Sequence, residues 1–221
     1  MQKYLQRLLI PVFALMSFGL MAQEEGNTVI PASGATTPPT AMLEGTDYIT
    51  KFPNETPDKP VLVEFFSYMC PHCYSTEPMI QAWLKQKPDD VELIRVPVTF
   101  GRGQWRLAAK AYYIAEELDV VHAFSSAMFN AIHAQRRPPR NENQLADIFG
   151  QIGVSEEAFK KAARSFSVDS KLRKSDYLVR KYQVSAVPYF LVNYKYETAP
   201  KRFETQESLF ELWNNLPKRD F

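Results

Sequence analysis

The stretch from residue 60 to residue 86 limits the possible folds of this chain more than any other. It opens with an apolar run, PVLVEFFS, whose length and β-branched and aromatic content predict a buried strand. Both cysteines of the chain, Cys70 and Cys73, follow this run directly. From Tyr74 onward the apolar residues have helical spacing. We therefore expect a strand to end and a helix to begin at the cysteine pair, with a bend in the helix at Pro78.

The rest of the chain contains a long helical block flanked by further strands. Residues 91–98, VELIRVPV, predict a second strand, and helical patterns dominate from residue 104 to about residue 182. The helical segments read QWRLAAKAYYIAEEL, VHAFSSAMFNAIHAQ, NQLADIFGQI, SEEAFKKAARSF and DSKLRKSDYLVRKY. After the block, AVPYFLVN (186–193) predicts a strand, KRFET (201–205) a short strand, and QESLFELWNNL (206–216) a terminal amphipathic helix.

This order of elements predicts one α/β domain that carries a helical insertion. Residues 43–103 and 183–221 form the two parts of the domain, and residues 104–182 form the insertion, whose last helix is expected to pack back on the domain. The composition, 45% hydrophobic and 23% charged, is that of a globular protein. The net charge of +1 provides no general attraction to nucleic acid.

The N-terminus predicts export. Residues 1–22 combine a basic start, MQKYLQR, with an apolar run, LLIPVFALMSFGLMA, as secretory signal peptides do. We expect cleavage after Ala22; Leu20 stands where a small residue is preferred, so a retained membrane anchor is the alternative. Residues 23–42 are rich in Thr, Ala and Pro and predict a flexible leader. Export would place the cysteines in a compartment where disulfides persist.

The spacing of the two cysteines argues for redox chemistry. A Cys70–Cys73 disulfide closes too small a loop to stabilise the fold much, which disfavours a structural staple. Half of a zinc site is also disfavoured, because tetrahedral zinc needs about four ligands. The remaining histidines, His122 and His133, fall in the helical block and are read as ordinary surface or partly buried residues. We therefore predict a redox-active disulfide, no metal site and no separate cofactor.

The residues around Cys70 favour a thiolate. A helix N-terminus carries a partial positive charge and unpaired N–H groups. His72 can donate a hydrogen bond to the sulfur or stand beside it as a cation, and Pro71 fits the first helical turn. We expect the pKa of Cys70 to lie below that of a free cysteine, which stabilises the reduced pair and makes its disulfide a stronger oxidant. Cys73, one turn further on and more buried, would be the resolving cysteine.

Two other positions are candidates for the same site. Glu64 lies inside the apolar strand, where a carboxylate is costly unless it is paired or protonated. It is predicted to shuttle protons for Cys73; the alternative is a carboxylate that reaches the surface. Arg95, in the neighbouring strand, is either its partner or an edge residue. For Val187-Pro188, the residues alone leave a cis bond and a trans proline entering an edge strand as open alternatives.

The chain resembles the DsbA group of periplasmic thiol:disulfide oxidoreductases, from about residue 43 to residue 216. The resemblance rests on VEFFSYMCPHCY, VTFGRGQWRLAAKAY and VSAVPYFLVN. It implies a thioredoxin fold with a helical insertion domain. A low cysteine pKa and an oxidising disulfide are known properties of DsbA proteins. The resemblance also implies that Cys70 is the nucleophile and Cys73 the resolving cysteine.

The resemblance assigns the remaining site residues by position. Glu64 matches the buried acid of the family, and Arg95 stands where the family often has a lysine. That departure keeps the charge and puts the proton-shuttle role in doubt. Val187 and Pro188 match a cis-proline loop that faces the disulfide and binds substrate.

The function expected from these residues is disulfide donation from Cys70–Cys73 to exported polypeptides in the periplasm. The expected partners are reduced substrates and a DsbB-like, quinone-linked membrane oxidase, and the protein is expected to be a monomer. A disulfide isomerase or reductase is one alternative. A redox-independent chaperone or metal-binding module on the same fold is the other. The aromatic residues Tyr112, Tyr113, Phe124 and Phe129 have helical spacing and are predicted to lie in the core.

Overall fold

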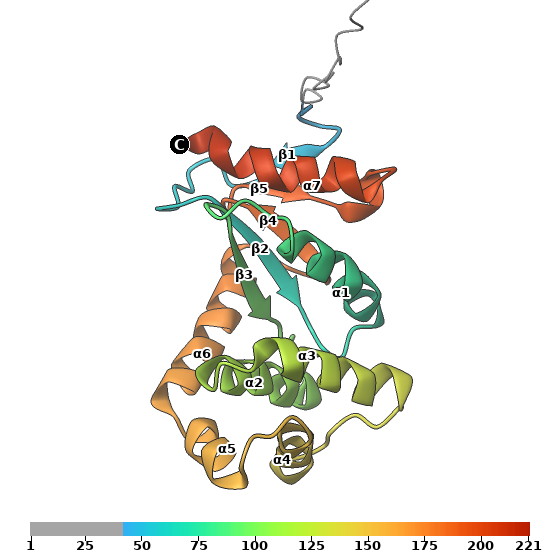
Figure 1. Ribbon diagram of the computed structural model, residues 1–221. Coiled ribbons are helices and arrows are strands. Elements are labelled where there is room, and N and C mark those ends of the chain that lie inside the picture. The colour runs from blue at the N-terminus through green and yellow to red at the C-terminus, as the bar shows by residue number, and fades with distance from the viewer. Residues whose placement is uncertain (1–41) are drawn as a thin grey trace, which may run out of the picture. The chain divides into compact units, whose positions relative to one another are not determined.

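A five-stranded mixed sheet with the strand order β1-β5-β4-β2-β3 forms the centre of the upper half in Figure 1. This computed structural model describes residues 42–221, so the predicted signal segment 1–22 and nearly all of the leader 23–42 lie outside the described residues. The strands are β1 (Tyr48–Thr50), β2 (Val61–Phe66), β3 (Glu92–Pro97), β4 (Tyr189–Val192) and β5 (Tyr196–Thr198). β2 and β3 run parallel, and the other neighbouring strands are antiparallel.

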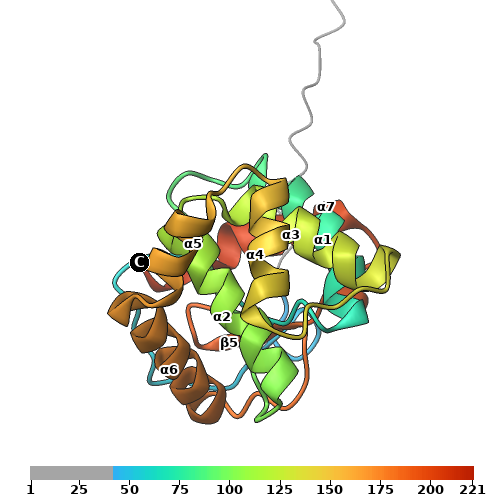
Figure 2. The ribbon, with the colours of Figure 1, turned by 90° about the horizontal axis from the view of Figure 1, so that it is seen from below.

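Helices α2 to α6 lie between β3 and β4 in the chain, as the predicted insertion requires. The α-helices are α1 (Pro71–Leu84), α2 (Gly103–Glu117), α3 (Val121–Phe129), α4 (Glu142–Gln151), α5 (Glu156–Ala163), α6 (Phe166–Lys181) and α7 (Gln206–Asn215). A π-helical turn, η1 (Asn130–Ala134), continues α3, and two 3₁₀ turns, η2 (Pro200–Arg202) and η3 (Leu216–Asp220), flank α7. Seen from below, α2 to α5 form a layer across one end of the sheet (Figure 2).

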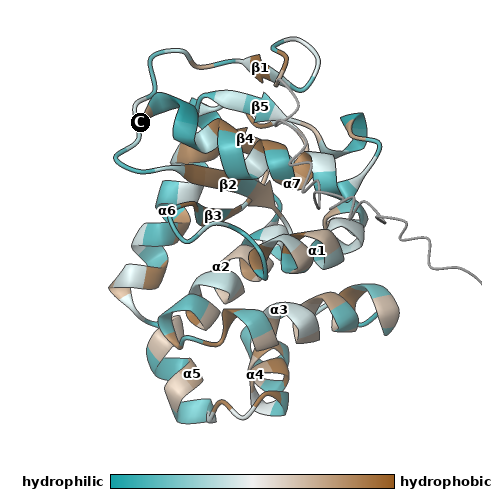
Figure 3. Ribbon diagram, turned by 45° about the horizontal axis from the view of Figure 1, so that its top comes forward, coloured by the Kyte–Doolittle hydropathy of each residue, from teal (hydrophilic) through white to brown (hydrophobic). Residues whose placement is uncertain are grey.

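Alternate side chains of β2 enter different parts of the core, because successive side chains of a strand point to opposite faces. Leu62 belongs to a cluster with Trp83 of α1 and Trp213 of α7, which cover one face of the sheet. Val63 and its neighbours on the other face pack against the C-terminal part of α6, where Tyr182 follows the last turn. Every side chain of β2 is buried, and the strand is strongly apolar apart from its glutamate (Figure 3).

A third apolar cluster joins the end of β2 and the cysteines to α2 through α5. The four aromatic residues predicted for the core are buried within it, which confirms that reading: Tyr112, Tyr113, Phe124 and Phe129. The insertion therefore shares a core with the active-site region.

Two local predictions need correction, and one strand was missed. KRFET is not a strand, because Pro200 starts the 3₁₀ turn η2, and the strand that pairs with β4 is β5, a few residues earlier. A tight turn brings β5 back along β4, with Asn193 and Tyr194 in left-handed conformations (φ 53° and 56°). The segment 121–135 is not one α-helix but α3 followed by η1. The three-residue edge strand β1 was not predicted at all.

Candidate active site

Cys70 lies at the junction of β2 and α1, as its sequence position predicts. Its backbone is extended (φ −94°, ψ 119°) and it occupies the N-cap position of the helix. The connecting turn is fixed by Ser67, whose carbonyl accepts from the Cys70 N–H at 3.0 Å and whose hydroxyl accepts from the Met69 N–H at 3.1 Å. Pro71 occupies the first helical position, where its missing N–H costs no helical hydrogen bond. The free N–H groups of the first helical turn therefore lie next to the Cys70 side chain.

The two cysteines, present as free thiols, occupy different environments. Cys70 retains 7% of its surface, whereas Cys73 retains 1%. Burial raises the pKa of the Cys73 thiol far above its usual range; the Glu64 and Cys70 side chains act in the same direction, against a hydrogen bond with the Ser67 backbone. Cys73 therefore stays protonated, and Cys70 is the cysteine from which a thiolate can attack an incoming sulfur.

The Val187-Pro188 peptide is cis and lies against the reactive cysteine. The Cys70 thiol donates a hydrogen bond to the carbonyl oxygen of Val187, with 3.4 Å between the heavy atoms. This contact joins two segments that are far apart in the sequence, and it agrees with the position implied by the DsbA resemblance.

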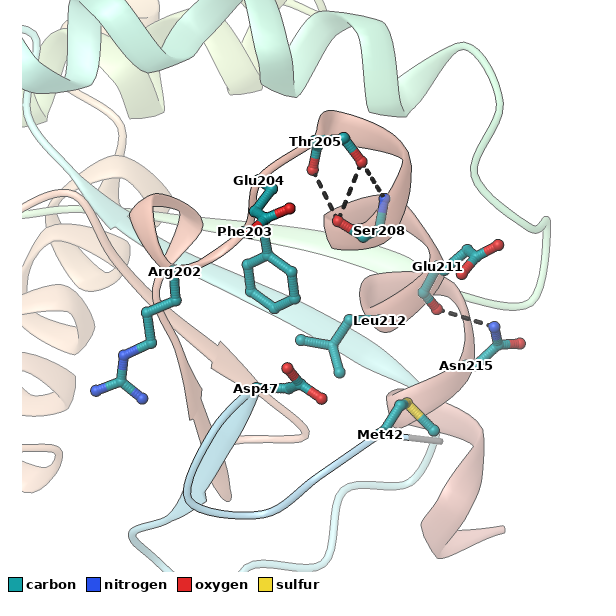
Figure 4. Close-up of a pocket in the computed structure, with 10 residues that line it drawn as sticks. All are labelled: Met42, Asp47, Arg202, Phe203, Glu204, Thr205, Ser208, Glu211, Leu212 and Asn215. Atoms are coloured by element: carbon teal, nitrogen blue, oxygen red, sulfur yellow. Dashed lines mark hydrogen bonds between the residues drawn. The ribbon is translucent and has the colours of Figure 1, made fainter. Parts of the chain in front are cut away.

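A groove of about 420 Å³ opens beside this contact. We call it the cis-proline groove; its lining comprises His72, Thr76, Ala186–Tyr189 and Glu197–Lys201. It has room for a short stretch of polypeptide next to Cys70. Another hollow lies beside the N-terminus of α7 and contains no cysteine and no predicted site residue (Figure 4). Of these two hollows, the cis-proline groove is the one that adjoins the reactive cysteine.

His72 is exposed, and its position differs in one respect from the expectation. Among residues 42–221, the hydrogen bond of the Cys70 sulfur is to Val187, and none connects it to the imidazole of His72. His72 instead lines the cis-proline groove. Its exposed ring is therefore placed to contact a chain bound in that groove.

Glu64 is buried, so the alternative of a carboxylate that reaches the surface is wrong. It retains 1% of its surface and pairs across the parallel strands with Arg95, whose Nε donates to Glu64 Oε2 at 2.7 Å. Arg95 also holds Glu77 of α1 with both terminal nitrogens, at 2.7 Å and 3.3 Å. Arg95 is thus the partner of Glu64 and not merely an edge residue. Glu64 Oε1, in contrast, has no hydrogen-bond partner among the described residues.

The cluster contains one cation, Arg95, and two carboxyl groups, Glu64 and Glu77. Burial raises the pKa of the Glu64 carboxyl, and the attraction of Arg95 does not offset that effect, since Glu77 adds repulsion. Burial disfavours the Arg95 cation as well, but Glu64 and Glu77 together outweigh this, so the pKa of Arg95 is raised and it stays charged. One cation shared by two carboxylates leaves Glu64 as the group of the cluster that can hold a proton.

The structure adds His133 to the site, which the sequence analysis treated as an ordinary residue. Its Nε2 lies 2.8 Å from the carbonyl oxygen of Tyr68, two residues before Cys70. Its ring stacks on Tyr74, the residue after Cys73, with 4.8 Å between ring centres and 11° between planes. The Tyr68 hydroxyl shares a 2.7 Å hydrogen bond with Ser125 of α3. No local sequence signal marks these contacts, because they join the cysteine segment to residues far along the chain.

The assembled groups suit thiol–disulfide exchange. One thiol lies at a helix N-terminus beside a groove, and a second thiol is buried and protonated. The buried carboxyl of Glu64, whose own pKa is raised, acts on that second thiol and helps to raise its pKa. Within residues 42–221, no group of three or more His, Cys, Asp or Glu side chains is arranged to hold a metal ion.

Comparisons with known proteins agree with this chemistry. Residues 61–210 match the family described as the DSBA-like thioredoxin domain. The thiol:disulfide interchange protein DsbA of Azotobacter vinelandii is 37% identical over 161 residues, which cover 72% of this chain and 75% of that protein. DsbA of Pseudomonas aeruginosa is 35% identical over 157 residues, or 71% of this chain and 74% of that protein.

Solved structures give the same result. The crystal structure of Pseudomonas aeruginosa DsbA matches with a TM-score of 0.70 and 32% identity, over 80% of this chain and 93% of that one. DsbA from Xylella fastidiosa matches with a TM-score of 0.69 and 27% identity, over 80% and 97%. The sheet with its inserted helices is thus a thioredoxin fold with a helical insertion. With a matching cysteine site, a matching fold and relatives above 30% identity, the chain belongs to the DsbA family of thiol:disulfide oxidoreductases.

Proposed function

We propose that this protein donates its Cys70–Cys73 disulfide to exported polypeptides during oxidative folding. The observation that carries this proposal is the asymmetry of the two sulfurs: Cys70 at a helix N-terminus beside a groove, and Cys73 buried. A substrate thiolate attacks Cys70 Sγ, the Cys70–Cys73 bond breaks, and Cys73 leaves with the electron pair and takes up a proton. A second substrate thiolate then attacks the substrate sulfur of the mixed disulfide. The bond between the substrate and Cys70 breaks, so the substrate gains a disulfide and Cys70 and Cys73 end as thiols.

The cis-proline groove is the proposed substrate site. The Val187 carbonyl already accepts a hydrogen bond from Cys70, so its backbone lies within reach of a chain whose sulfur approaches Cys70. Extended polypeptides bind such exposed backbone groups, while side-chain pockets supply selectivity. Val187 and Pro188 would contact the substrate on one side of the reacting sulfur, and His72 would contact it at the start of α1.

Glu64 is proposed as the group that exchanges a proton with Cys73. Arginine does not release its proton in proteins, so Arg95 cannot relay one as a lysine might. A proton held by the buried cluster must therefore reside on a carboxylate. Glu64 meets this need because its pKa is raised and its Oε1 is unpartnered among the described residues.

The disulfide itself carries the two electrons, so the proposed reaction uses no separate cofactor. We place the protein in the periplasm on the basis of the predicted signal segment 1–22, and we propose that it acts there as a monomer. A DsbB-like, quinone-linked membrane oxidase would restore the disulfide. Among residues 42–221, the helices are too short or too polar to cross a membrane.

The deciding experiment is the redox equilibrium of the mature protein with glutathione, followed by fluorescence or thiol alkylation. A disulfide donor is reduced even in mildly oxidising glutathione buffer. A pair that stays oxidised in strongly reducing buffer would instead support a reductase. Loss of oxidase activity in Cys70→Ser, with chaperone activity absent from both forms, would exclude the redox-independent binding module.

A further inference from the structure

A cationic surface lies on the insertion, outside the site described above. The segment Q-R-R-P-P-R, residues 135–140, joins η1 to α4 and carries three exposed arginines, Arg136, Arg137 and Arg140. From residue 120 to residue 141 the chain contains no acidic residue. Together with neighbouring side chains the arginines line a groove of about 430 Å³. We call it the arginine groove; its polar lining is Gln135, Arg136, Arg137, Arg140, Gln144, Asp147 and Gln151.

The positive charge of the arginine groove is largely uncompensated. No carboxylate among the described residues forms a salt bridge with any of the three guanidinium groups. The first acid that follows, Glu142, is held by Lys110 at 2.8 Å. Asp147 is the one acid among the lining residues, and it is exposed. The groove therefore retains an excess of positive charge for a ligand.

The backbone that carries these arginines is held in place. The Arg137 N–H donates to the Ala131 carbonyl at 2.7 Å, and the Arg140 N–H donates to the Gln144 side chain at 2.8 Å. Two prolines follow Arg137, and the second of them, Pro139, is buried. A fixed backbone reduces the conformational entropy that binding must remove, which favours recognition over a merely solvated loop.

The turn η1, which borders the arginine groove, contacts the active-site helix α1 on the side away from the cis-proline groove. His72 and Thr76 line the cis-proline groove, whereas Tyr74, two residues from each, stacks on His133 of η1. Residues two apart point to opposite sides of an α-helix. The arginine-bearing segment begins two residues after His133, and Figure 3 shows α1 and α3 running alongside each other. Ala131 lines the arginine groove and lies two residues before His133, so the groove opens on the face of η1 turned away from α1.

We propose that the arginine groove binds an acidic segment of the substrate polypeptide that lies outside the segment reacting at Cys70. Guanidinium groups bind carboxylates with two parallel hydrogen bonds, and the glutamine amides of the lining can bond peptide groups. A polypeptide fits better than a membrane surface, since interfacial sites combine cations with exposed large apolar side chains. The large exposed apolar residues of the described chain are Leu43, Tyr74, Phe166, Tyr177 and Phe221, and none of them lines the groove.

This inference rests on the proposed disulfide exchange, so its test separates the two. The oxidised protein is mixed with two reduced peptides, each with two cysteines and otherwise identical. One carries four Asp or Glu residues on one flank, and the other carries Asn and Gln there. We expect the acidic peptide to reduce the protein roughly five- to tenfold faster at low salt, and 0.5 M NaCl to remove the difference. The rate with the neutral peptide measures disulfide exchange alone, so failure of the proposed function would appear as no reaction with either peptide.

Charge-removal variants locate the effect. Arg136→Gln, Arg137→Gln and Arg140→Gln together should abolish the preference and leave the neutral peptide unaffected. The matched control removes three charges at the C-terminal end of α5 in the same insertion: Lys160→Gln, Lys161→Gln and, at the residue after the helix, Arg164→Gln. Equal rates for the two peptides with the wild-type protein, or equal loss of preference in the control, would overturn the proposal. So would arginine-dependent binding to phosphatidylglycerol vesicles without any peptide preference, which would identify a lipid contact instead.

Discussion

The imidazole of His133 donates from Nε2 to the carbonyl oxygen of Tyr68, across 2.8 Å, and so ties the inserted helices to the turn that presents Cys70. His133 lies in η1, where the helix widens to π-type spacing; such turns occur frequently at functional sites. The ring is also stacked on Tyr74, so it contacts the chain both before and after the cysteine pair. Because a carbonyl oxygen can only accept, this contact requires a hydrogen on Nε2.

We therefore predict that His133 is a positioning residue for Cys70. In His133→Gln the Tyr68 carbonyl loses a fixed donor, which should cost about 1 kcal/mol of unfolding free energy. The turn then holds Cys70 less firmly at the helix N-terminus. We expect the glutathione equilibrium to shift about two- to fivefold toward the disulfide, and Cys70 alkylation to slow by a similar factor. His122→Gln, at an exposed histidine of the same helical segment, is the control. Lower stability with an unchanged equilibrium would reduce His133 to a structural role.

The different burial of the two sulfurs predicts different trapping behaviour. Cys73→Ser should accumulate a stable mixed disulfide between Cys70 and a single-cysteine peptide, because no internal thiol remains to release it. Cys70→Ser should form at least tenfold less, since Cys73 is buried and its raised pKa keeps it protonated at neutral pH. Mass spectrometry of the intact protein measures both yields. Comparable trapping by the two variants would mean that Cys73 is accessible, contrary to the structure.

The exposed position of His72 predicts an effect that salt can screen. No hydrogen bond joins its ring to the Cys70 sulfur in the described structure, so we predict that His72 acts on the sulfur through space. His72→Gln should shift the glutathione equilibrium several-fold toward the disulfide in dilute buffer. In 1 M NaCl, where screening extends over about 3 Å, the difference between variant and wild type should shrink. An equally large difference in high salt would point to a direct hydrogen bond formed in solution.

The fold near the cysteines was predictable because its signals are local. The apolar run that became β2, the cysteine pair and the helical spacing of α1 lie within one continuous stretch, and each has a physical cause that acts over a few residues. The helices of the insertion were predicted for the same reason. β5 was misplaced, because its position is set by pairing with β4 and by the turn at Asn193, not by its own composition. The edge strand β1 is too short to show a pattern.

The site was predictable only where its residues adjoin the cysteines or match the family. Glu64 could be identified as unusual from its strand, but its pairing with Arg95 depends on the register of β2 against β3. That Arg95 also binds Glu77 depends on how α1 packs over the sheet. The contact of His133 with Tyr68 spans 65 residues of sequence. Only the folded chain reveals such contacts, because no local preference of either residue encodes them.

The Glu64 carboxyl predicts a specific dependence of stability on pH. Its pKa is raised above the ordinary 4.5 in the folded protein, so the folded state binds this proton more tightly than the unfolded chain does. Between pH 4.5 and the folded pKa, the folded state carries more protons, and the unfolding free energy falls as pH rises through that window. Glu64→Gln removes the titration and keeps the size of the side chain, while Arg95 retains Glu77 as its partner.

We expect the unfolding free energy of Glu64→Gln, minus that of the wild type, to increase from pH 4.5 to pH 7. The increase should be on the order of 1–3 kcal/mol, as found when a buried, imperfectly compensated charge is removed. Urea unfolding of the reduced proteins at a series of pH values measures it, with Glu211→Gln, at an exposed glutamate of α7, as a surface control that should show no such trend. A difference that stays flat or decreases would mean that Arg95 keeps Glu64 ionised. Glu64 would then have no proton to give Cys73, and another group would have to supply it.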